Sequence, residues 1–372
     1  MKPIYLDYNA TTPLMPEVLE AMLPYLVEHF GNPSSGHAFG QRAKEGVERS
    51  RSQVAMLLGC EGGEVLFTGG GTEANNLAIR GVVEARGLDR VITSVIEHPA
   101  VEQPCRALEA LGVEVVRLPV DGRGVVRLEA LEQALSKGRA LVSVMHANNE
   151  TGALQPIAGI AQLAHSRGAL VHTDAAQSVG KLPTRVDELG VDLLTIAGHK
   201  LYAPKGVGAL YVRRGTPLSP FARGAGHERG LRPGTENVAS IVALGAACEL
   251  AVQQPPADRL SRLTARLLEG LRAGVVGLEL NGPEGAERLP NTLNVSAPGI
   301  LGRVWLAETP EVAASTGSAC HEGQDTPSGV LVAMGLSRER ALGAIRLSVG
   351  RPTTEVEIET AIAALARAAR RS

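Results

Sequence analysis

The sequence predicts an α/β fold, with a large domain built on a mainly parallel seven-stranded sheet flanked by helices and a smaller α+β domain. Helical stretches alternate with short apolar runs between residues 40 and 250, and each run is closed by Gly, Asn, Asp or Thr. This alternation is typical of βαβ units. Most runs are apolar throughout, as expected for strands that helices cover on both faces. The 372 residues suffice for two domains.

The predicted elements follow in order along the chain. A helix at residues 41–58 precedes the strands of the large sheet, which are predicted at residues 64–68, 91–94, 113–118, 141–146, 170–173, 193–196 and 208–212. The sequence QQPPA at residues 253–257 then interrupts the pattern, because paired prolines indicate a linker or a helix boundary. Beyond it we expect helices at 260–271 and 355–369 and strands at 291–296 and 344–349. We therefore expect a large domain at residues 13–252 and a small domain at residues 1–12 and 253–372.

Composition excludes several classes of function. A formal charge of -2 and a pI near 6.5 give no general attraction to nucleic acid or to an anionic membrane. The N-terminal MKPIYLDYNATTPL lacks an apolar signal core, and no run approaches the roughly 18 apolar residues of a membrane span, so we expect a cytoplasmic protein. The four cysteines are widely spaced and form no C-x-x-C pair, so we expect neither disulfides nor zinc. They are Cys60, Cys105, Cys248 and Cys320.

A glycine turn follows the first predicted strand of the sheet. In FTGGGTEANN, Gly71 and Thr72 lead directly into a helix. The free backbone N–H groups and the dipole at such a helix start favour a phosphate. An ordinary tight turn with Thr72 as N-cap is an equally good interpretation of these residues alone. The absence of a G-K-[ST] ending argues against a Walker nucleotide loop.

Polar side chains end several other predicted strands. His98, Asn149, Asp174 and Gln177 each lie just beyond an apolar run. Any one of them alone is more often a cap or a turn residue. Their recurrence favours a site, because ligands of a doubly wound sheet bind beyond the carboxyl ends of its strands.

The predicted strand at residues 193–196 leads into His199 and Lys200. A charge at the end of a buried strand is costly unless the pKa of the amine is lowered or the amine is covalently modified, as in a Schiff-base lysine. A lysine that snorkels to solvent is the alternative. Pyridoxal phosphate (PLP) requires a phosphate site, an imine lysine, a carboxylate at its pyridine nitrogen and a group stacked on its ring. In this sequence Gly71 and Thr72 supply the phosphate site, and Lys200 is the imine lysine. Asp174 supplies the carboxylate, and His98 is the group stacked on the ring.

Cys320 lies in the small-residue stretch STGSACHEGQ, which predicts an exposed loop. A thiol on such a loop is a candidate nucleophile, and an incidental surface thiol is the alternative. Cys248 differs, because it lies among alanines and leucines and is predicted to be structural.

These motifs resemble those of the class V aminotransferase-like family of fold-type I PLP enzymes, and within it the cysteine desulfurases of the NifS/IscS group. The resemblance extends over nearly the whole chain and preserves the order of the family's motifs. The matching segments are LDYNATTP, GNPSS, FTGGGTEANNLAI, EHPAV, NNETG, HTDAAQSVGK, GHKLYAPKGVGALYVRR, RPGTEN, STGSAC and IRLSVGRPTT.

The resemblance implies a role for each candidate residue. Lys200 would be the Schiff-base lysine, Asp174 would pair with the pyridine nitrogen and His98 would stack on the ring. Gln177 and Asn149 would bond the cofactor oxygen or the substrate carboxylate. The groups that would hold the phosphate are Gly71, Thr72, His199 and, across a homodimer interface, Thr235.

The resemblance also implies the reaction. L-Cysteine would be converted to L-alanine, with Arg346 clamping the substrate carboxylate and His98 serving as a proton shuttle. Cys320 would receive the sulfur as a persulfide. An iron–sulfur scaffold or a tRNA-thiolation carrier would then accept the sulfur.

The chain departs from the family pattern at three places, and none removes a residue that the chemistry needs. Ala197 stands where many desulfurases have a serine that reaches the phosphate, so Thr195 or water would have to compensate. The cysteine loop continues as HEGQDTPSGVL rather than a serine-rich sequence, and Ala225 interrupts a glycine run.

Other functions fit parts of the same pattern. A selenocysteine lyase would share Lys200, Asp174 and His98 but would not need Cys320. A simple aminotransferase has no use for a loop cysteine. A sulfur-delivery or scaffolding protein would bind the cofactor and turn over slowly without a partner. A nucleotide-binding module comes last, since the glycine turn lacks the lysine.

Overall fold

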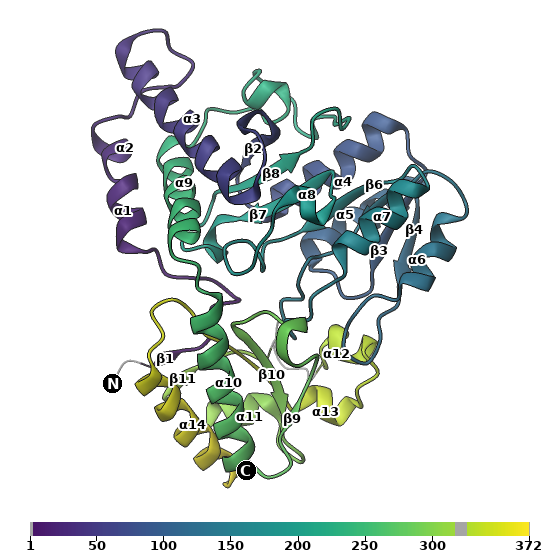
Figure 1. The fold of residues 1–372 in the computed structure, drawn as a ribbon, viewed down its shortest axis with the longest axis vertical. Helices are drawn as coiled ribbons and strands as arrows, with labels where there is room; N and C mark the ends of the chain where they lie inside the picture. Colours follow the sequence, from purple (N-terminus) through teal and green to yellow (C-terminus); the bar gives the residue numbers. More distant parts are fainter. Residues whose placement is uncertain (1–2, 317–325, 372) are drawn as a thin grey trace.

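Two lobes, each with its own sheet and its own apolar core, make up the chain (Figure 1). The computed structural model describes residues 3–316 and 326–371, so Cys320 lies outside the described residues. The upper lobe carries a seven-stranded sheet, and the lower lobe carries a three-stranded sheet together with both ends of the chain.

The large sheet has the strand order β2-β8-β7-β6-β5-β3-β4, and β8 alone among these strands runs opposite to the others. This arrangement confirms the predicted mainly parallel sheet. Because the remaining strands share one direction, the carboxyl ends of β2, β3, β5, β6 and β7 lie at one edge. The strands are β2 Val65–Thr68, β3 Arg90–Ser94, β4 Glu114–Leu118, β5 Leu141–Ser143, β6 Leu170–Asp174, β7 Leu193–Ala197 and β8 Gly208–Val212.

Helices cover both faces of the large sheet, which explains why most of its strands are mainly apolar. On one face, α4 (Gly71–Arg86) and α5 (Pro99–Glu109) pack against Leu66, Val91 and Leu193. On the other, the next residue of each strand (Phe67, Ile92 and Leu194) packs against a second set of helices. That set includes α3 Ala38–Leu58, α7 Ile157–Ser166 and α9 Val238–Gln253. The upper lobe also contains α1 Pro16–Met22, α2 Pro24–Val27, α6 Leu128–Leu135 and α8 Val186–Leu189.

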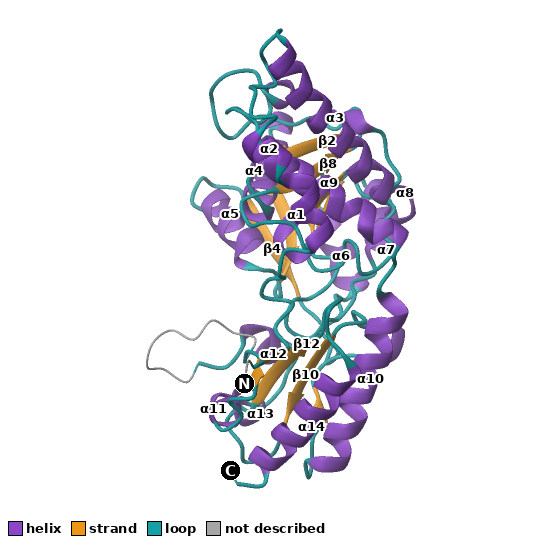
Figure 2. Ribbon diagram, turned by 90° about the vertical axis from the view of Figure 1, so that its left-hand side faces the viewer, coloured by secondary structure: helices purple, strands orange, loops and turns teal. Residues whose placement is uncertain are grey.

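The lower lobe has a separate core around the fully buried Trp305, whose indole N–H donates to the carbonyl of Leu365 at 2.9 Å. The three-stranded sheet is antiparallel in the order β12-β10-β9, and β1 pairs in parallel with β11 beside it. Figure 2 shows α10 and α14 on one side of this sheet. The elements are β1 Ile4–Tyr5, α10 Ala257–Gly274, β9 Glu279–Leu280, β10 Thr292–Ser296, α11 Gly302–Ala307, β11 Val312–Ala313, β12 Ala344–Ser348 and α14 Glu355–Ala369.

Two short helices, α12 (Gly329–Ala333) and α13 (Arg338–Leu342), connect the lobes. Leu331 of α12 and Met334, which directly follows this helix, belong to the apolar core of the upper lobe, although they lie late in the chain. The N-terminal residues connect the lobes from the other direction, since Leu6 is in the lower core and the Thr12 N–H donates to the His199 carbonyl at 2.9 Å. The edge of the large sheet at which the carboxyl ends of its parallel strands lie thus faces residues from both ends of the sequence.

The QQPPA break separates α9 from α10, as predicted, and the two helices are bent by 79° relative to each other. In the part of the chain that the structure describes, no single helix is long and apolar enough to cross a membrane. The bent pair of α9 and α10 reaches the length and apolar composition of a membrane span only when the two helices are counted together as one segment.

Candidate active site

Lys200 lies in a short 3₁₀ turn, Gly198–Lys200, directly after β7. Its ammonium Nζ donates to the carbonyls of Asn9 at 2.5 Å and Ala10 at 2.7 Å. Burial and the positive charge of Arg346 together lower the pKa of this amine to about 8, against the raising effect of Asp7 and Asp174. The side chain is therefore a half-buried amine that loses its proton more readily than an ordinary lysine.

Asp174 is the last residue of β6 and is buried. Its Oδ1 accepts from the Ala176 N–H at 2.9 Å, and its Oδ2 accepts from the Asn75 amide at 2.8 Å. Both carboxylate oxygens are thus held in a fixed orientation by N–H donors. Asn75 was not predicted as a site residue. It lies on α4 four residues after Gly71, where helical spacing is the only sequence signal that could have found it.

His98 is the N-cap of α5, where its Nδ1 accepts from the Ala100 N–H at 3.1 Å. A neutral ring held in this way carries its proton on Nε2. The packing around His98 lowers the pKa of the imidazole, Asp174 raises it and Lys200 lowers it. His98, Asp174 and Lys200 thus lie close enough at the edge of the sheet for their charges to influence one another.

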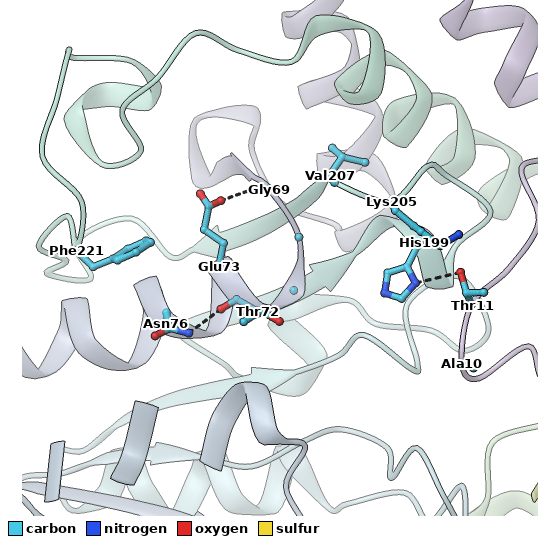
Figure 3. Close-up of a pocket in the computed structure, with 13 residues that line it drawn as sticks. Ala10, Thr11, Gly69, Thr72, Glu73, Asn76, His199, Lys205, Val207 and Phe221 are labelled. Carbon is cyan, nitrogen blue, oxygen red and sulfur yellow. Dashed lines mark hydrogen bonds between the residues drawn. The ribbon is translucent and has the colours of Figure 1, made fainter. Parts of the chain in front are cut away.

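A pocket of about 890 Å³ opens beside this group, at the start of α4 (Figure 3). Gly70 has a φ of 146°, which a residue with a Cβ rarely adopts. A Cβ at Gly71 would lie 3.1 Å from that of Ala197, so the turn packs tightly against the end of β7. The pocket is lined by Ala10, Thr11, Gly69, Gly70, Gly71, Thr72, Glu73, Asn76, His199, Lys205, Gly206, Val207 and Phe221.

His199 faces this pocket, where its Nδ1 lies 3.2 Å from the Thr11 hydroxyl (Figure 3). Burial, together with the positive charges of Lys200 and Lys205, lowers the pKa of His199 to about 4. Thr11 is a second pocket residue that the sequence did not single out. Thr195 does not compensate for Ala197, because its hydroxyl bonds His172 Nε2 at 3.0 Å and the residue is fully buried.

Arg346, in β12, reaches the same edge from the lower lobe. Its Nη1 donates to the Asn149 carbonyl at 3.0 Å, and its Nη2 pairs with Asp7 at 2.7 Å. The buried Nε has no hydrogen-bond partner among the described residues. Asp7 is a further residue that sequence reasoning missed.

Gln177 lies in the turn after β6, where its amide nitrogen donates to the Asn9 carbonyl at 3.0 Å. The same carbonyl accepts from Lys200. Asn9 is almost completely buried. Its side-chain amide nitrogen donates to the Asn149 carbonyl at 3.2 Å and to the Thr292 hydroxyl at 2.9 Å. The N-terminal segment therefore forms one wall of the site.

Two predicted residues stand apart from this group. Thr235 is exposed and is not among the residues that line the pocket of its own chain. Cys320 lies outside the described residues, so its predicted role has no structural test.

The residues present fit PLP. The glycine turn at the start of α4 disfavours side chains, through the φ of Gly70 and the close contact of Gly71 with Ala197, and it offers backbone donors, as a phosphate site requires. A lysine with a lowered pKa and a carboxylate oriented by two donors lie at the neighbouring strand ends. These are the groups that a Schiff-base cofactor with a pyridine nitrogen needs.

Comparison with known proteins identifies the family. The model of the aminotransferase class-V family matches residues 4–360. The chain belongs to this family and, within it, to the cysteine desulfurases. It is 44% identical to the cysteine desulfurase IscS of Dictyoglomus turgidum, over 98% of this chain and 94% of that protein. It is 46% identical to the cysteine desulfurase of Trichormus azollae, over 97% and 92% of the two chains.

Solved structures agree with this assignment. A NifS-like protein superposes with a TM-score of 0.91 at 37% identity, covering 98% of this chain and 99% of that one. SspA in complex with cysteine superposes with a TM-score of 0.83 at 36% identity, covering 93% and 98%. The chain thus has the fold of a fold-type I enzyme. As a member of the class-V aminotransferase family, it uses PLP as its cofactor.

Proposed function

We propose that this chain is a PLP-dependent cysteine desulfurase that converts L-cysteine to L-alanine and passes the sulfur to Cys320 as a persulfide. The observation that carries the proposal is the convergence of Lys200, Asp174 and His98 at the carboxyl edge of the large sheet, beside the glycine turn. The desulfurase relatives and the cysteine complex of SspA support the choice of substrate.

The site residues divide the work of holding the cofactor. PLP, when bound, supplies an electron sink for the negative charge that develops at the substrate Cα. Lys200 would hold it covalently, and the carboxylate of Asp174 would keep its pyridine nitrogen protonated. Gly71, Thr72 and the neutral His199 would bind the phosphate, and His98 would stack on the ring.

Arg346 and Lys200 would act on the substrate. The Arg346 guanidinium, buried beside Asn149, would bind the carboxylate of L-cysteine as a planar fork. Because the pKa of Lys200 is lowered to about 8, a free Lys200 amine is available near neutral pH to take the proton from Cα. Gln177 would donate to the cofactor oxygen.

The sulfur step would use Cys320 as nucleophile. Its thiolate would attack the substrate sulfur, so that an S–S bond forms while the substrate Cβ–S bond breaks. The electron pair left on the carbon skeleton would take up protons to give L-alanine, with His98 Nε2 as a proton shuttle. An iron–sulfur scaffold or a tRNA-thiolation carrier would then receive the outer sulfur.

The proposal includes a homodimer in the cytoplasm. Exposed apolar side chains gather on α1, α2, α3 and the segments between them, which is the composition of an interface. They include Leu19, Leu23, Leu26, Val27, Phe30 and Phe39. The exposed Thr235 of the partner subunit would then complete the phosphate site. We also propose the domain division at residues 13–252, which the two separate apolar cores support.

The decisive experiment compares three proteins reconstituted with PLP: wild type, Lys200→Ala and Cys320→Ala. Each receives L-cysteine and a reducing thiol, and sulfide and alanine are measured together with the absorbance of the bound cofactor. Wild type is expected to release both products in equal amounts. Cys320→Ala is expected to bind PLP but release neither product, and Lys200→Ala to lose the absorbance of the covalently held cofactor.

The alternative outcome would identify a selenocysteine lyase. If Cys320→Ala retained full activity, or if only selenocysteine were consumed, sulfur transfer to this thiol would not be part of the reaction. A wild-type protein that released alanine only with an acceptor protein present would instead be a sulfur-delivery component.

A further inference from the structure

Lys181 is a buried lysine that the proposed mechanism does not use. It lies in the turn after β6, seven residues beyond Asp174, and is only 6% exposed. Two consecutive backbone hydrogen bonds close this turn. The Ser178 N–H donates to the Ala175 carbonyl and the Lys181 N–H donates to the Ser178 carbonyl, each at 3.0 Å. A lysine placed so deeply needs an explanation, because burial of its charge is costly.

The Lys181 ammonium bonds to one residue only among those described. Its Nζ donates to the backbone carbonyl of Gln177 at 2.9 Å and to the side-chain oxygen of the same residue at 3.2 Å. None of the ion pairs found in the described ranges includes Lys181. The charged groups that act on it are Lys200 and Arg346, both positive, and together with burial they lower the pKa of Lys181 to about 7.

This contact determines which way the Gln177 amide faces. A charged lysine side chain has only N–H donors, and the neutral amine keeps two of them, so either form can donate to the amide oxygen that is turned toward Lys181. The amide nitrogen is then turned the other way, where it donates to the Asn9 carbonyl at 3.0 Å. That carbonyl also accepts from Lys200 Nζ, so the Gln177 NH2 group lies at the reactive amine.

We propose that Lys181 is a positioning residue that fixes the Gln177 amide with its NH2 group toward the cofactor. This inference rests on the proposed function, in which Gln177 donates a hydrogen bond to the cofactor oxygen. Without Lys181 the amide can rotate by 180° and present an acceptor to that oxygen. An oriented donor stabilises negative charge on the oxygen most when the Lys200 imine is unprotonated, so its loss raises the pH at which the bound cofactor titrates.

The test is a pH titration of the absorbance of PLP-loaded protein, in four variants that form a double-mutant cycle. They are wild type, Lys181→Met, Gln177→Leu and the double variant. Methionine keeps the length of the lysine and removes its donors. Lys137→Met is the matched control, because this lysine side chain is 70% exposed and lies far from Gln177 in the chain. Equilibrium dialysis of PLP gives a second readout, and Lys181→Leu, which also lacks donors, replaces Lys181→Met if the methionine variant does not fold.

We expect Lys181→Met to raise the titration midpoint by about half to one pH unit, the effect of one lost hydrogen bond of ordinary strength. The same substitution is expected to change nothing in the Gln177→Leu background, and PLP is expected to bind several-fold more weakly to Lys181→Met. An unchanged midpoint in Lys181→Met would overturn the proposal. An equal shift in both backgrounds would also overturn it, because Lys181 would then act only through its charge. Failure of the proposed function itself looks different, since wild type would then show no band of covalently held cofactor.

Discussion

At the scale of single residues, the site depends on hydrogen bonds that hold the expected chemical groups in position. Asp174 is oriented by Asn75 from a helix that lies about a hundred residues earlier in the chain. A bond between a neutral donor and a carboxylate in a buried place is stronger than an ordinary hydrogen bond. The carboxylate that would face the pyridine nitrogen therefore depends on an uncharged neighbour.

Substitution of Asn75 is expected to weaken cofactor binding without preventing folding. In Asn75→Ala, one Asp174 oxygen loses its donor, and we expect PLP to bind about tenfold more weakly, as for the loss of one hydrogen bond to a charged group. Asn75→Asp is expected to bind worse still, because it places a second negative charge beside Asp174. Equilibrium dialysis of PLP measures both. Equal affinity in wild type and Asn75→Ala would show that Asp174 needs no such support.

A second residue-scale prediction concerns His172, which is fully buried in β6. Its Nδ1 bonds the Ser143 hydroxyl at 2.8 Å and its Nε2 bonds that of Thr195 at 3.0 Å. Burial lowers the pKa of His172 to about 3. Because the unfolded state then binds more protons, the stability that the neutral ring contributes is complete above pH 6.5 and declines as the pH falls toward 3.

We expect His172→Gln to lower the free energy of unfolding at pH 7.5 by about 1–3 kcal/mol, because buried hydroxyl groups lose a partner. The difference from wild type is expected to shrink at pH 5, where wild type loses up to about 1.4 kcal/mol per pH unit below 6.5. Urea denaturation at the two pH values tests this. A difference that does not change with pH would contradict the assignment.

At the scale of elements, the glycine turn depends on its contact with β8. A Cβ at Gly208 would lie 2.5 Å from the Ile196 carbonyl oxygen and within 3 Å of the Gly70 backbone. No side chain can move aside to relieve a contact between backbone atoms. The reversed strand β8 thus comes close enough to support the turn only because its first residue is glycine.

Gly208→Ala is therefore expected to lower the free energy of unfolding by about 1–3 kcal/mol, the usual cost of overpacking. It is also expected to weaken PLP binding, since the Gly70 turn must shift. Gly36→Ala is the matched control, because a Cβ there meets nothing within 4 Å. Thermal denaturation and PLP dialysis of both variants provide the comparison. Equal melting temperatures in Gly208→Ala and wild type would contradict the close contact.

At the scale of the whole molecule, the site lies where three separate parts of the chain meet. The large sheet supplies Lys200 and Asp174, the N-terminal segment supplies Asn9, and the lower lobe supplies Arg346. If a partner subunit adds Thr235, the phosphate site is complete only in the dimer. Subunit exchange can test this, because each active site would then contain residues of two chains.

Mixed dimers of Lys200→Ala and Thr235→Ala subunits are expected to regain activity. In such a dimer one site combines Lys200 of one subunit with Thr235 of the other, and so matches wild type. Desulfurase activity after unfolding and refolding the mixture is expected to exceed the mean of the two parent proteins treated alone. Activity equal to that mean would show that Thr235 does not act across the interface.

The sequence predicted the fold and the charged residues of the site because both follow from local patterns. Apolar runs covered on both faces predicted the strands of the large sheet, and most predicted strand ends lie within one or two residues of the observed ends. The exception is β5, which ends at Ser143 rather than at residue 146, although His146 still donates its N–H to the Asp174 carbonyl at 2.9 Å. Lys200, Asp174 and His98 stood out because a polar residue at the end of a buried strand needs a reason.

The tertiary structure alone decided which neighbouring groups orient those charges. Asn75, Asn9, Asp7 and Lys181 lie within the family's motifs, but no local pattern distinguishes them individually from cap, turn or surface residues. Asn9 and Lys200 are 191 positions apart, and Asp7 and Arg346 are 339 apart. No periodicity or spacing encodes contacts at such separations. They arise only when strand order, the N-terminal segment and the lower lobe are packed together, because a hydrogen bond requires its two atoms within about 3 Å.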